Sequence, residues 1–214
     1  MLTRGVTAFV AGCAVLAGCG TTTGTPVAAT PPAEQPAAPS PPASPPGSAG
    51  SESPAATLPV PIEFSLPEGW QSVPPADVGV PEAAFVALHP ASRGDGSVPT
   101  IVITGDVRDS TVDLEDIAAE SVKQLETPGT EVRVESSKES GTAAIPALTQ
   151  AVRISPGPRG HELLQLQTFL GMSDTTDPRR RAVLEFALTT QPEHFQELAV
   201  DFQEFVSTVR VESG

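Results

Sequence analysis

Cysteine is nearly absent from this 214-residue chain, which contains only Cys13 and Cys19. If residues 1–18 are removed, Cys19 has no second cysteine to pair with, and an intramolecular disulfide is excluded. The remaining chain must then draw its stability from a packed core. The same shortage leaves no free thiol to act as a nucleophile beyond Cys19.

Basic residues are also scarce, because 12 Lys and Arg stand against 26 Asp and Glu, for a formal net charge of -14. Nucleic-acid binding requires a basic footprint, so no nucleic-acid partner is expected. The excess of acid also repels the chain from anionic lipid headgroups. Arg179, Arg180 and Arg181 form the one basic run. They are candidates for contacting an anionic ligand, and the alternative interpretation is a solvated turn.

No hydrophobic run is long enough to span a bilayer as a helix, which takes about 20 apolar residues. The apolar segment that follows Arg4 covers only residues 5–16 and leads into Leu16-Ala17-Gly18-Cys19. This layout is typical of a removable export signal. Because the small residues lead into a cysteine, we predict a lipoprotein signal peptide over residues 1–18.

Cleavage would make Cys19 the first residue of the mature protein, carrying a diacylglyceryl group on its thiol and an N-acyl chain. Two or more acyl chains anchor a protein stably, whereas one chain gives marginal binding. We therefore expect a protein held on the extracytoplasmic face of the cell membrane. A similar pattern ends at Cys13, but the apolar run before it is too short. The other alternative is a plain secretory signal with two incidental cysteines.

Residues 19–57 are predicted to form a disordered tether. From residue 20 onward this stretch has ten prolines in 38 residues and is rich in Ala, Thr, Ser and Gly. Such a composition cannot bury a core. Its reach lies between roughly 35 Å for a coil and about 120 Å for an extended polyproline chain. Pro39 to Pro46 also has the composition of a polyproline recognition motif, which would need an aromatic groove on a partner.

Residues 58–214 have the size of one globular domain. Period-two alternation and bounding turn residues predict a series of strands. The last four of them have the spacing of an antiparallel meander. The predicted strands cover Ile62 to Leu66, Ala84 to Leu88, Thr100 to Val107, Glu131 to Glu135, Ala147 to Ile154, Glu162 to Leu170 and Ala182 to Thr189.

Two amphipathic helices are predicted among these strands. The first runs from about Asp113 to Leu125, with acids at its positive end, and Thr127-Pro128-Gly129 stops it. The second opens at Pro192 and repeats apolar residues at steps of three and four as far as Val209. Each helix would lay one face against a sheet, so we expect an α+β sandwich, an antiparallel sheet flanked by two helices.

Both ends of this domain resemble a known family. Phe64-Ser65-Leu66-Pro67-Glu68-Gly69-Trp70 is similar to the opening strand and turn of the LpqN/LpqT lipoproteins of mycobacteria and related actinobacteria. Val183 to Thr190, followed by Pro192-Glu193-His194-Phe195 and the helix after it, resembles that family's last strand and helix. The resemblance implies a Mog1/PsbP-like fold, which hosts binding and scaffolding proteins, and a role in the envelope, including glycolipid trafficking.

Motifs for catalysis are missing from the domain. It has no Gly-x-Ser-x-Gly elbow and no phosphate-binding glycine loop. The histidines His89, His161 and His194 lack the spacing of zinc ligands. The acids from Asp106 to Asp116 lack the order of a calcium loop, and their position at a helix start explains them. We therefore expect no metal, no cofactor and no catalytic residue.

Trp70, the only tryptophan, is either a core residue or an indole that lines a ligand groove. We keep it with Arg179, Arg180 and Arg181 as a candidate for ligand binding. Together these features predict a non-enzymatic, lipid-anchored, monomeric envelope protein. Its partner would be a protein or an envelope glycolipid. The alternatives are an envelope hydrolase with an unrecognised site and an inert surface spacer.

Overall fold

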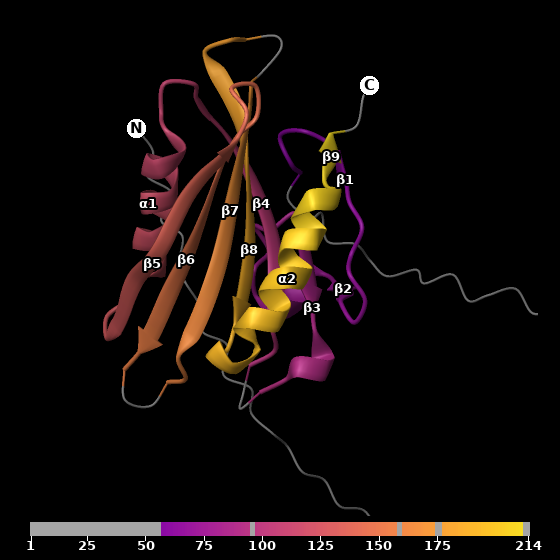
Figure 1. The fold of residues 1–214 in the computed structure, drawn as a ribbon, viewed down its shortest axis with the longest axis vertical. Helices are drawn as coiled ribbons and strands as arrows, with labels where there is room; N and C mark the ends of the chain where they lie inside the picture. Colours follow the sequence, from indigo (N-terminus) through magenta and orange to yellow (C-terminus); the bar gives the residue numbers. More distant parts are fainter. Residues whose placement is uncertain (1–56, 95–96, 158–159, 174–176, 212–214) are drawn as a thin grey trace, which may run out of the picture. The chain divides into compact units, whose positions relative to one another are not determined.

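A computed structural model describes residues 57–94, 97–157, 160–173 and 177–211. The predicted signal peptide, Cys19 and nearly all of the predicted tether lie outside these residues. A seven-stranded antiparallel sheet forms the centre of the domain, with one helix on each face (Figure 1). The strand order is β2-β3-β4-β8-β7-β6-β5. The fold is therefore α+β, as the sequence predicted.

Thirteen elements follow one another along the described chain. They are β1 (Ile62–Glu63), β2 (Gln71–Val73), the 3-10 turn η1 (Pro75–Val78), β3 (Phe85–Leu88), η2 (Pro90–Ser92), β4 (Thr100–Asp109), α1 (Leu114–Leu125), β5 (Thr130–Gly141), β6 (Pro146–Pro156), β7 (Leu163–Ser173), β8 (Arg180–Thr190), α2 (Pro192–Thr208) and β9 (Arg210–Val211).

Strands β5 to β8 form the predicted meander, and β8 continues the sheet by pairing with β4 over its whole length. A second, two-stranded ladder joins the beginning of the domain to its end. In this ladder Ile62 of β1 pairs with Val211 of β9. The first and last strands of the described chain are thus neighbours in space.

Helix α2 covers an apolar core on one face of the sheet. Its Leu198, Phe202 and Phe205 are buried against Phe186 and Leu188 of β8. The rings of Phe186 and Phe205 meet edge to face, with centroids 6.0 Å apart. Aromatic pairs of this geometry add to the stabilisation that their buried area provides. The apolar stripe that the sequence predicted is the side of α2 that packs against the sheet.

Helix α1 covers part of the opposite face. Its buried Leu114, Ile117 and Ala118 pack with Leu148 of β6 and Phe169 of β7. This cluster is smaller than the one beneath α2, and α1 lies over β5, β6 and β7. The part of the face formed by β4 and β8 extends beyond the helix. This offset leaves room for a pocket beside α1.

The structure differs from the sequence prediction at the edges of the fold. The predicted strand from Ile62 to Leu66 is only two residues long, because its partner β9 is equally short. Phe64 and Leu66 still pack against the core, although they do not pair with a neighbouring strand. The sequence prediction also missed β2, which pairs with β3.

Strand β5 is longer than predicted and continues to Gly141, pairing with β6 to its end. Ser140 and Gly141 are its last two residues. Gly141 has a φ of 82°, and a Cβ at this position would collide with the carbonyl oxygen of Ile145. Only glycine adopts such a backbone without strain.

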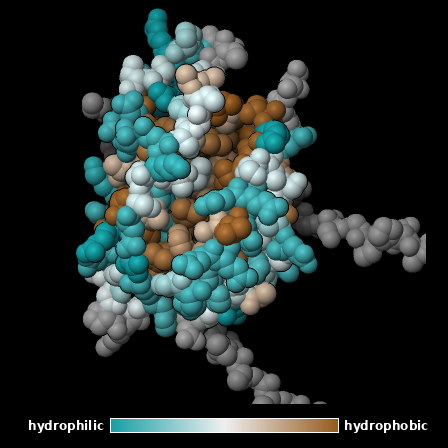
Figure 2. Space-filling model, viewed as in Figure 1, coloured by the Kyte–Doolittle hydropathy of each residue, from teal (hydrophilic) through white to brown (hydrophobic). Residues whose placement is uncertain are grey.

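Apolar side chains remain visible on the α2 face between polar ones (Figure 2). Partly buried residues that border the core beneath α2 include Leu170, Phe195 and Val206. Within the described ranges, no helix combines the length and hydropathy that a membrane crossing requires.

Candidate functional site

Polar side chains gather on the sheet face that α1 only partly covers. Glu185 of β8 lies directly opposite Thr104 of β4 in the strand register. Gln150 of β6 lies opposite Gln167 of β7 in the same way. Directly opposed side chains in an antiparallel pair stand about 5 Å apart. The four residues therefore form a polar band across the strands, in contrast to the apolar face beneath α2.

A chain of hydrogen bonds connects this band to α1. The buried Gln150 donates to the carbonyl oxygen of Ala118, at 3.2 Å, and to the side-chain oxygen of Gln167, at 2.6 Å. Gln167 donates to Ser121 Oγ at 2.9 Å, and Ser121 donates to Glu185 Oε1 at 2.9 Å. The chain ends on the Glu185 carboxyl group, which accepts a hydrogen bond.

A branch of the same network runs along β7. Gln167 also donates to Gln165 Oε1 at 2.8 Å, and Gln165 donates to Thr189 Oγ1 at 2.8 Å. Gln167 is 1% exposed, and its amide group has a partner for each N–H and for its oxygen. Buried polar groups are tolerated when they are satisfied in this way. The network fixes Ser121 and Gln165 at the edge of the pocket.

Glu185 is the only acid in the apolar run from Ala182 to Leu188. Burial raises the pKa of its carboxyl group. The hydrogen bond from Ser121 and the positive charge of Arg108 act in the opposite direction and are smaller effects. A desolvated carboxyl group in a cavity is one of the features by which functional sites are recognised.

The pocket beside α1 has a volume of about 390 Å³. Its floor is formed by β4, β7 and β8, one wall by α1, and the other by the segment after η1 with Val80 and Glu82. A volume of this size is at the lower end of the range for small-ligand sites. The lining alternates between apolar residues, such as Val102 and Val183, and the polar band with its Glu185 carboxyl group.

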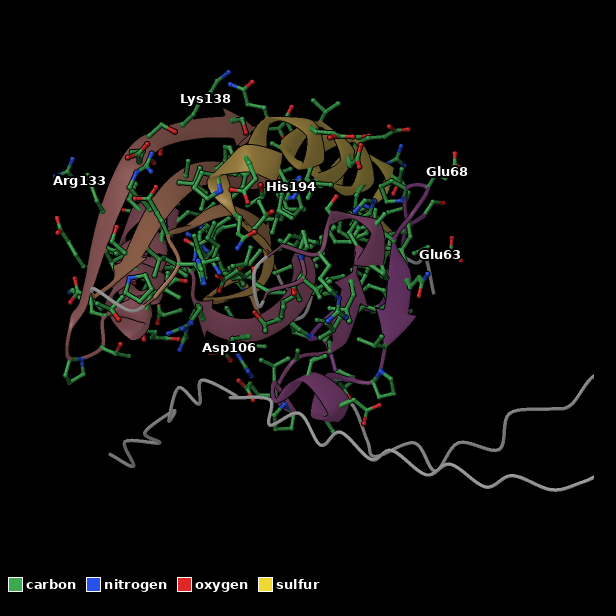
Figure 3. All side chains as sticks on the ribbon, turned by 90° about the horizontal axis from the view of Figure 1, so that it is seen from below. Glu63, Glu68, Asp106, Arg133, Lys138 and His194 are labelled. Carbon is green, nitrogen blue, oxygen red and sulfur yellow. The ribbon has the colours of Figure 1, made fainter. Side chains whose placement is uncertain are left out.

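Charged groups stand at the mouth of the pocket. Arg108 forms ion pairs with Asp106 at 3.2 Å and with Glu120 of α1 at 3.1 Å. Figure 3 shows Asp106 on the side of the sheet away from α2 and His194. Because Arg108 is already shared between two carboxylates, its charge is largely compensated within the protein.

The candidate residues from the sequence lie elsewhere. Trp70 is 7% exposed and belongs to the core on the α2 side, with its ring centroid 5.2 Å from that of His89. Its burial agrees with the core interpretation. Cys19 lies outside the described residues.

The basic run lies at the start of β8 and in the turn before it. Arg181 donates a hydrogen bond to the carbonyl oxygen of Ser110 and lines a small hollow of about 130 Å³. Arg179 and Arg180 are exposed. The structure does not bring Trp70 and the arginines together, and their role in ligand binding stays a prediction.

The acids considered for calcium do not form a metal site in the structure. Asp109 accepts hydrogen bonds from both the backbone and the hydroxyl group of Thr111, which lower the pKa of its carboxyl group. Asp113 is the residue that precedes the first turn of α1. Among the residues that the structure describes, no three His, Cys, Asp or Glu side chains are grouped as metal ligands.

Sequence reasoning did not identify Glu185 or the glutamines. The sequence did carry a signal for Glu185, because this acid interrupts the continuous apolar run Val183-Leu184-Glu185-Phe186-Ala187 of a buried strand. The glutamines at positions 165 and 167 share one face of β7 with Phe169. Their connection to Ser121, which is 46 residues away from Gln167 along the chain, depends on the strand register.

The arrangement is suited to holding a ligand. Its amide and hydroxyl groups bond mainly to one another, and the lining residues contribute a single desolvated acid. Acid–base chemistry usually relies on two titratable groups whose pKa values are pushed apart, and nucleophilic catalysis on a nucleophile beside a base. In the lining of this pocket the Ser121 hydroxyl group donates to the Glu185 carboxyl group, and Ser121 Oγ also accepts a hydrogen bond from Gln167.

Several solved structures are similar to this one at low sequence identity. LpqN, described as involved in cell envelope biogenesis of Mycobacterium tuberculosis, has a TM-score of 0.53 at 12% identity, covering 72% of this chain and 86% of that chain. Cyanobacterial PsbP from Synechocystis sp. PCC 6803 has a TM-score of 0.50 at 14% identity, covering 71% and 86%. The Ran-binding protein Mog1p of Saccharomyces cerevisiae has a TM-score of 0.46 at 12% identity, covering 70% and 89%.

No protein-family model and no curated protein matches the sequence. The comparison therefore concerns the fold, and it rests on LpqN and PsbP. It shows that the described residues form an α+β domain whose fold is similar to those of LpqN and PsbP.

Proposed function

We propose that this protein is a non-enzymatic, lipid-anchored binding protein of the cell envelope, and that the pocket beside α1 is its binding site. The observation that supports binding is the pocket itself, with a preformed hydrogen-bond network that ends on a largely buried carboxyl group. Pre-organised polar groups in a partly apolar cavity are the usual features of a ligand site. The likeness of the fold to LpqN is consistent with an envelope protein.

The anchor in this proposal is Cys19, followed by the tether of residues 19–57 and the single domain of residues 58–214. The domain carries 24 acidic and 11 basic residues, so its surface gives little attraction to anionic lipid. Acyl chains on Cys19 would supply the membrane attachment.

The partner class proposed from the sequence was a protein or an envelope glycolipid. A cavity of about 390 Å³ is suited to a head group or a small molecule, and the acyl chains of a lipid would stay outside it.

Photocrosslinking in living cells tests the binding site. A diazirine amino acid at Gln124, which lies on the pocket rim, should give a mass adduct on its own peptide. The matched control is the exposed Gln203 of α2, a helical glutamine on the other face of the sheet. Adducts from position 124 alone support the pocket as the site. Equal adducts from both positions, or none, contradict it.

Fractionation of cells tests the anchor. A Cys19→Ala variant should leave the membrane fraction or remain unprocessed, and a Cys13→Ala variant should behave as the wild type. Normal processing and full membrane retention of Cys19→Ala would contradict lipid anchoring at this residue.

A further inference from the structure

Glu185 is a largely buried acid without a counter-ion. Among the described residues, none forms an ion pair with its carboxylate. Arg108 is the basic residue that acts on it electrostatically, and this side chain is bound by Asp106 and Glu120. Buried carboxylates in proteins are almost always paired with a cation. In this pocket the place of the cation is open.

The groups that remain free around Glu185 can all accept hydrogen bonds. Ser121 uses its proton on Glu185 Oε1, and no hydrogen bond within the described ranges uses Oε2. The hydroxyl group of Thr104, directly opposite Glu185, has no side-chain partner in the described chain, and neither has the amide of Gln124. A carboxylate, a hydroxyl oxygen and an amide oxygen can accept three hydrogen bonds, which is the number that one primary ammonium group donates.

The charges near the pocket favour the same sign of ligand. Glu82 and Asp106 line its rim, and Glu120 stands beside Arg108. With Glu185 ionised, these four acids outnumber the one arginine. Clefts lined by one sign of charge concentrate ligands of the opposite sign. An anionic ligand would meet net repulsion at the entrance and an unpaired carboxylate at the floor.

The remaining lining suits a short carbon chain. Val80, Val102, Ile117, Leu125 and Val183 contribute apolar surface between the floor and the mouth. A ligand that carries its ammonium group to Glu185 would place its methylene groups against these side chains. Each buried methylene group contributes about 0.8 kcal/mol.

From this geometry we infer that the pocket binds a small free amine, with a primary ammonium group paired to Glu185 and a short alkyl portion packed between α1 and the segment after η1. This inference rests on the proposed function, because it names the ligand class of the same site. A neutral hydroxylated ligand, such as a sugar head group, would leave the Glu185 carboxylate without a cation.

Three probes of one size test the head group directly. Titration of the isotope-labelled full chain with n-butylammonium, n-butanol or butyrate, followed by NMR, reports binding at each backbone amide. We expect n-butylammonium to shift the amides of Ser121, Gln165 and Glu185. Its affinity should exceed that of n-butanol by about tenfold, because charge-assisted hydrogen bonds are roughly twice as strong as neutral ones. Butyrate should bind most weakly.

Two variants test whether the preference for n-butylammonium depends on the side chains of Glu185 and Thr104. Glu185→Gln keeps the shape and an acceptor for Ser121 but removes the charge, and it should lower the affinity for n-butylammonium to that for n-butanol. Thr104→Val, which removes one acceptor, should weaken n-butylammonium binding severalfold and keep the order of the probes. The control is Glu193→Gln in the exposed first turn of α2, which changes the net charge equally.

The outcomes separate this inference from the proposed function. Equal affinity for n-butylammonium and n-butanol, or an unchanged preference in a folded Glu185→Gln, overturns the ammonium site and leaves the pocket as a binding site. If glucose shifts the same amides and n-butylammonium does not, the ammonium site is likewise overturned and the pocket remains a binding site. Vesicles of phosphatidylethanolamine that bind where n-butylammonium does not would overturn the free amine in favour of a lipid head group. If no probe shifts any pocket amide, the inference fails, and the crosslinking at Gln124 decides the proposed function.

Discussion

The two faces of the central sheet are built from the same strands but serve different purposes. In β8, Leu184, Phe186 and Leu188 point toward α2 and are fully buried among apolar side chains. Glu185 lies between them and points toward the α1 side, where it ends a hydrogen-bond chain. A strand has two faces with period two, so neighbouring residues can take part in stability and in binding separately.

The difference between the faces shows how a small domain can tolerate a polar pocket. Burial of aromatic and aliphatic side chains under α2 supplies most of the apolar core. The α1 side has a smaller cluster and satisfies its buried amides by bonding them to one another. The α2 side can thus offset the lower stabilisation expected from the face that carries the pocket.

The largest expected effect comes from truncating the α2-side core. Phe186→Ala should lower the free energy of unfolding by about 3–5 kcal/mol, because the side chain is fully buried and its loss leaves a cavity. Urea denaturation measures this change. A loss below about 1 kcal/mol would mean that the core under α2 is not the main source of stability.

A smaller loss is expected from the polar network. Gln167→Ala should cost about 1–3 kcal/mol, because it removes the acceptor of Gln150 and the donor to Ser121 in a buried site. The same urea measurement applies, with Gln124→Ala as the exposed control. A cost as large as that of Phe186→Ala would show that the two faces contribute equally.

The pH dependence of stability distinguishes Glu185 from its neighbours. Its pKa is raised in the folded state, so the folded protein binds a proton more tightly than the unfolded chain. This contribution is fully present below the unfolded pKa and is lost as the pH rises through the folded pKa. Relative to Glu185→Gln, the wild type should therefore gain stability as the pH falls through this window. Parallel pH profiles of the two proteins would contradict the burial of an unpaired carboxyl group.

The smallest effect is expected on the solvent side of α2. Val200 is 64% exposed, and Val200→Ala should change the free energy of unfolding by no more than about 0.5 kcal/mol. Thermal or urea denaturation beside Leu198→Ala, which truncates a buried side chain of the same helix, gives the contrast. Similar losses for the two variants would contradict the exposure of Val200 on the solvent side of α2.

Periodicity along the chain predicted the helices and strands whose apolar residues recur at regular spacing. The stripe that includes Phe195, Leu198, Phe202 and Phe205 recurs at helical spacing, and the structure confirms it as the packing side of α2. The four-strand meander was also readable, because turn residues punctuate its apolar alternation. The length of β5 was not readable, since its second half consists of exposed polar residues that pair only through the backbone.

The candidate site could be recognised only from the register of the strands in the folded structure. Gln150, Gln167, Ser121 and Glu185 come from three strands and a helix, and no local pattern connects them. The sequence candidates were chosen by residue type, and Trp70 illustrates the limit of that approach. An indole beside a turn glycine is compatible with a groove or a core, and packing against the α2-side core places it inside.

The ladder between β1 and β9 has a consequence for chain connectivity. Because Ile62 pairs with Val211, a short linker could join the two ends of the described domain without crossing the sheet. New ends could then open in the exposed turn between β5 and β6, at residues 142–145. Circular permutants tolerate openings of this kind when the original termini are adjacent. An opening at residues 142–145 would leave intact every chain segment that lines the pocket beside α1.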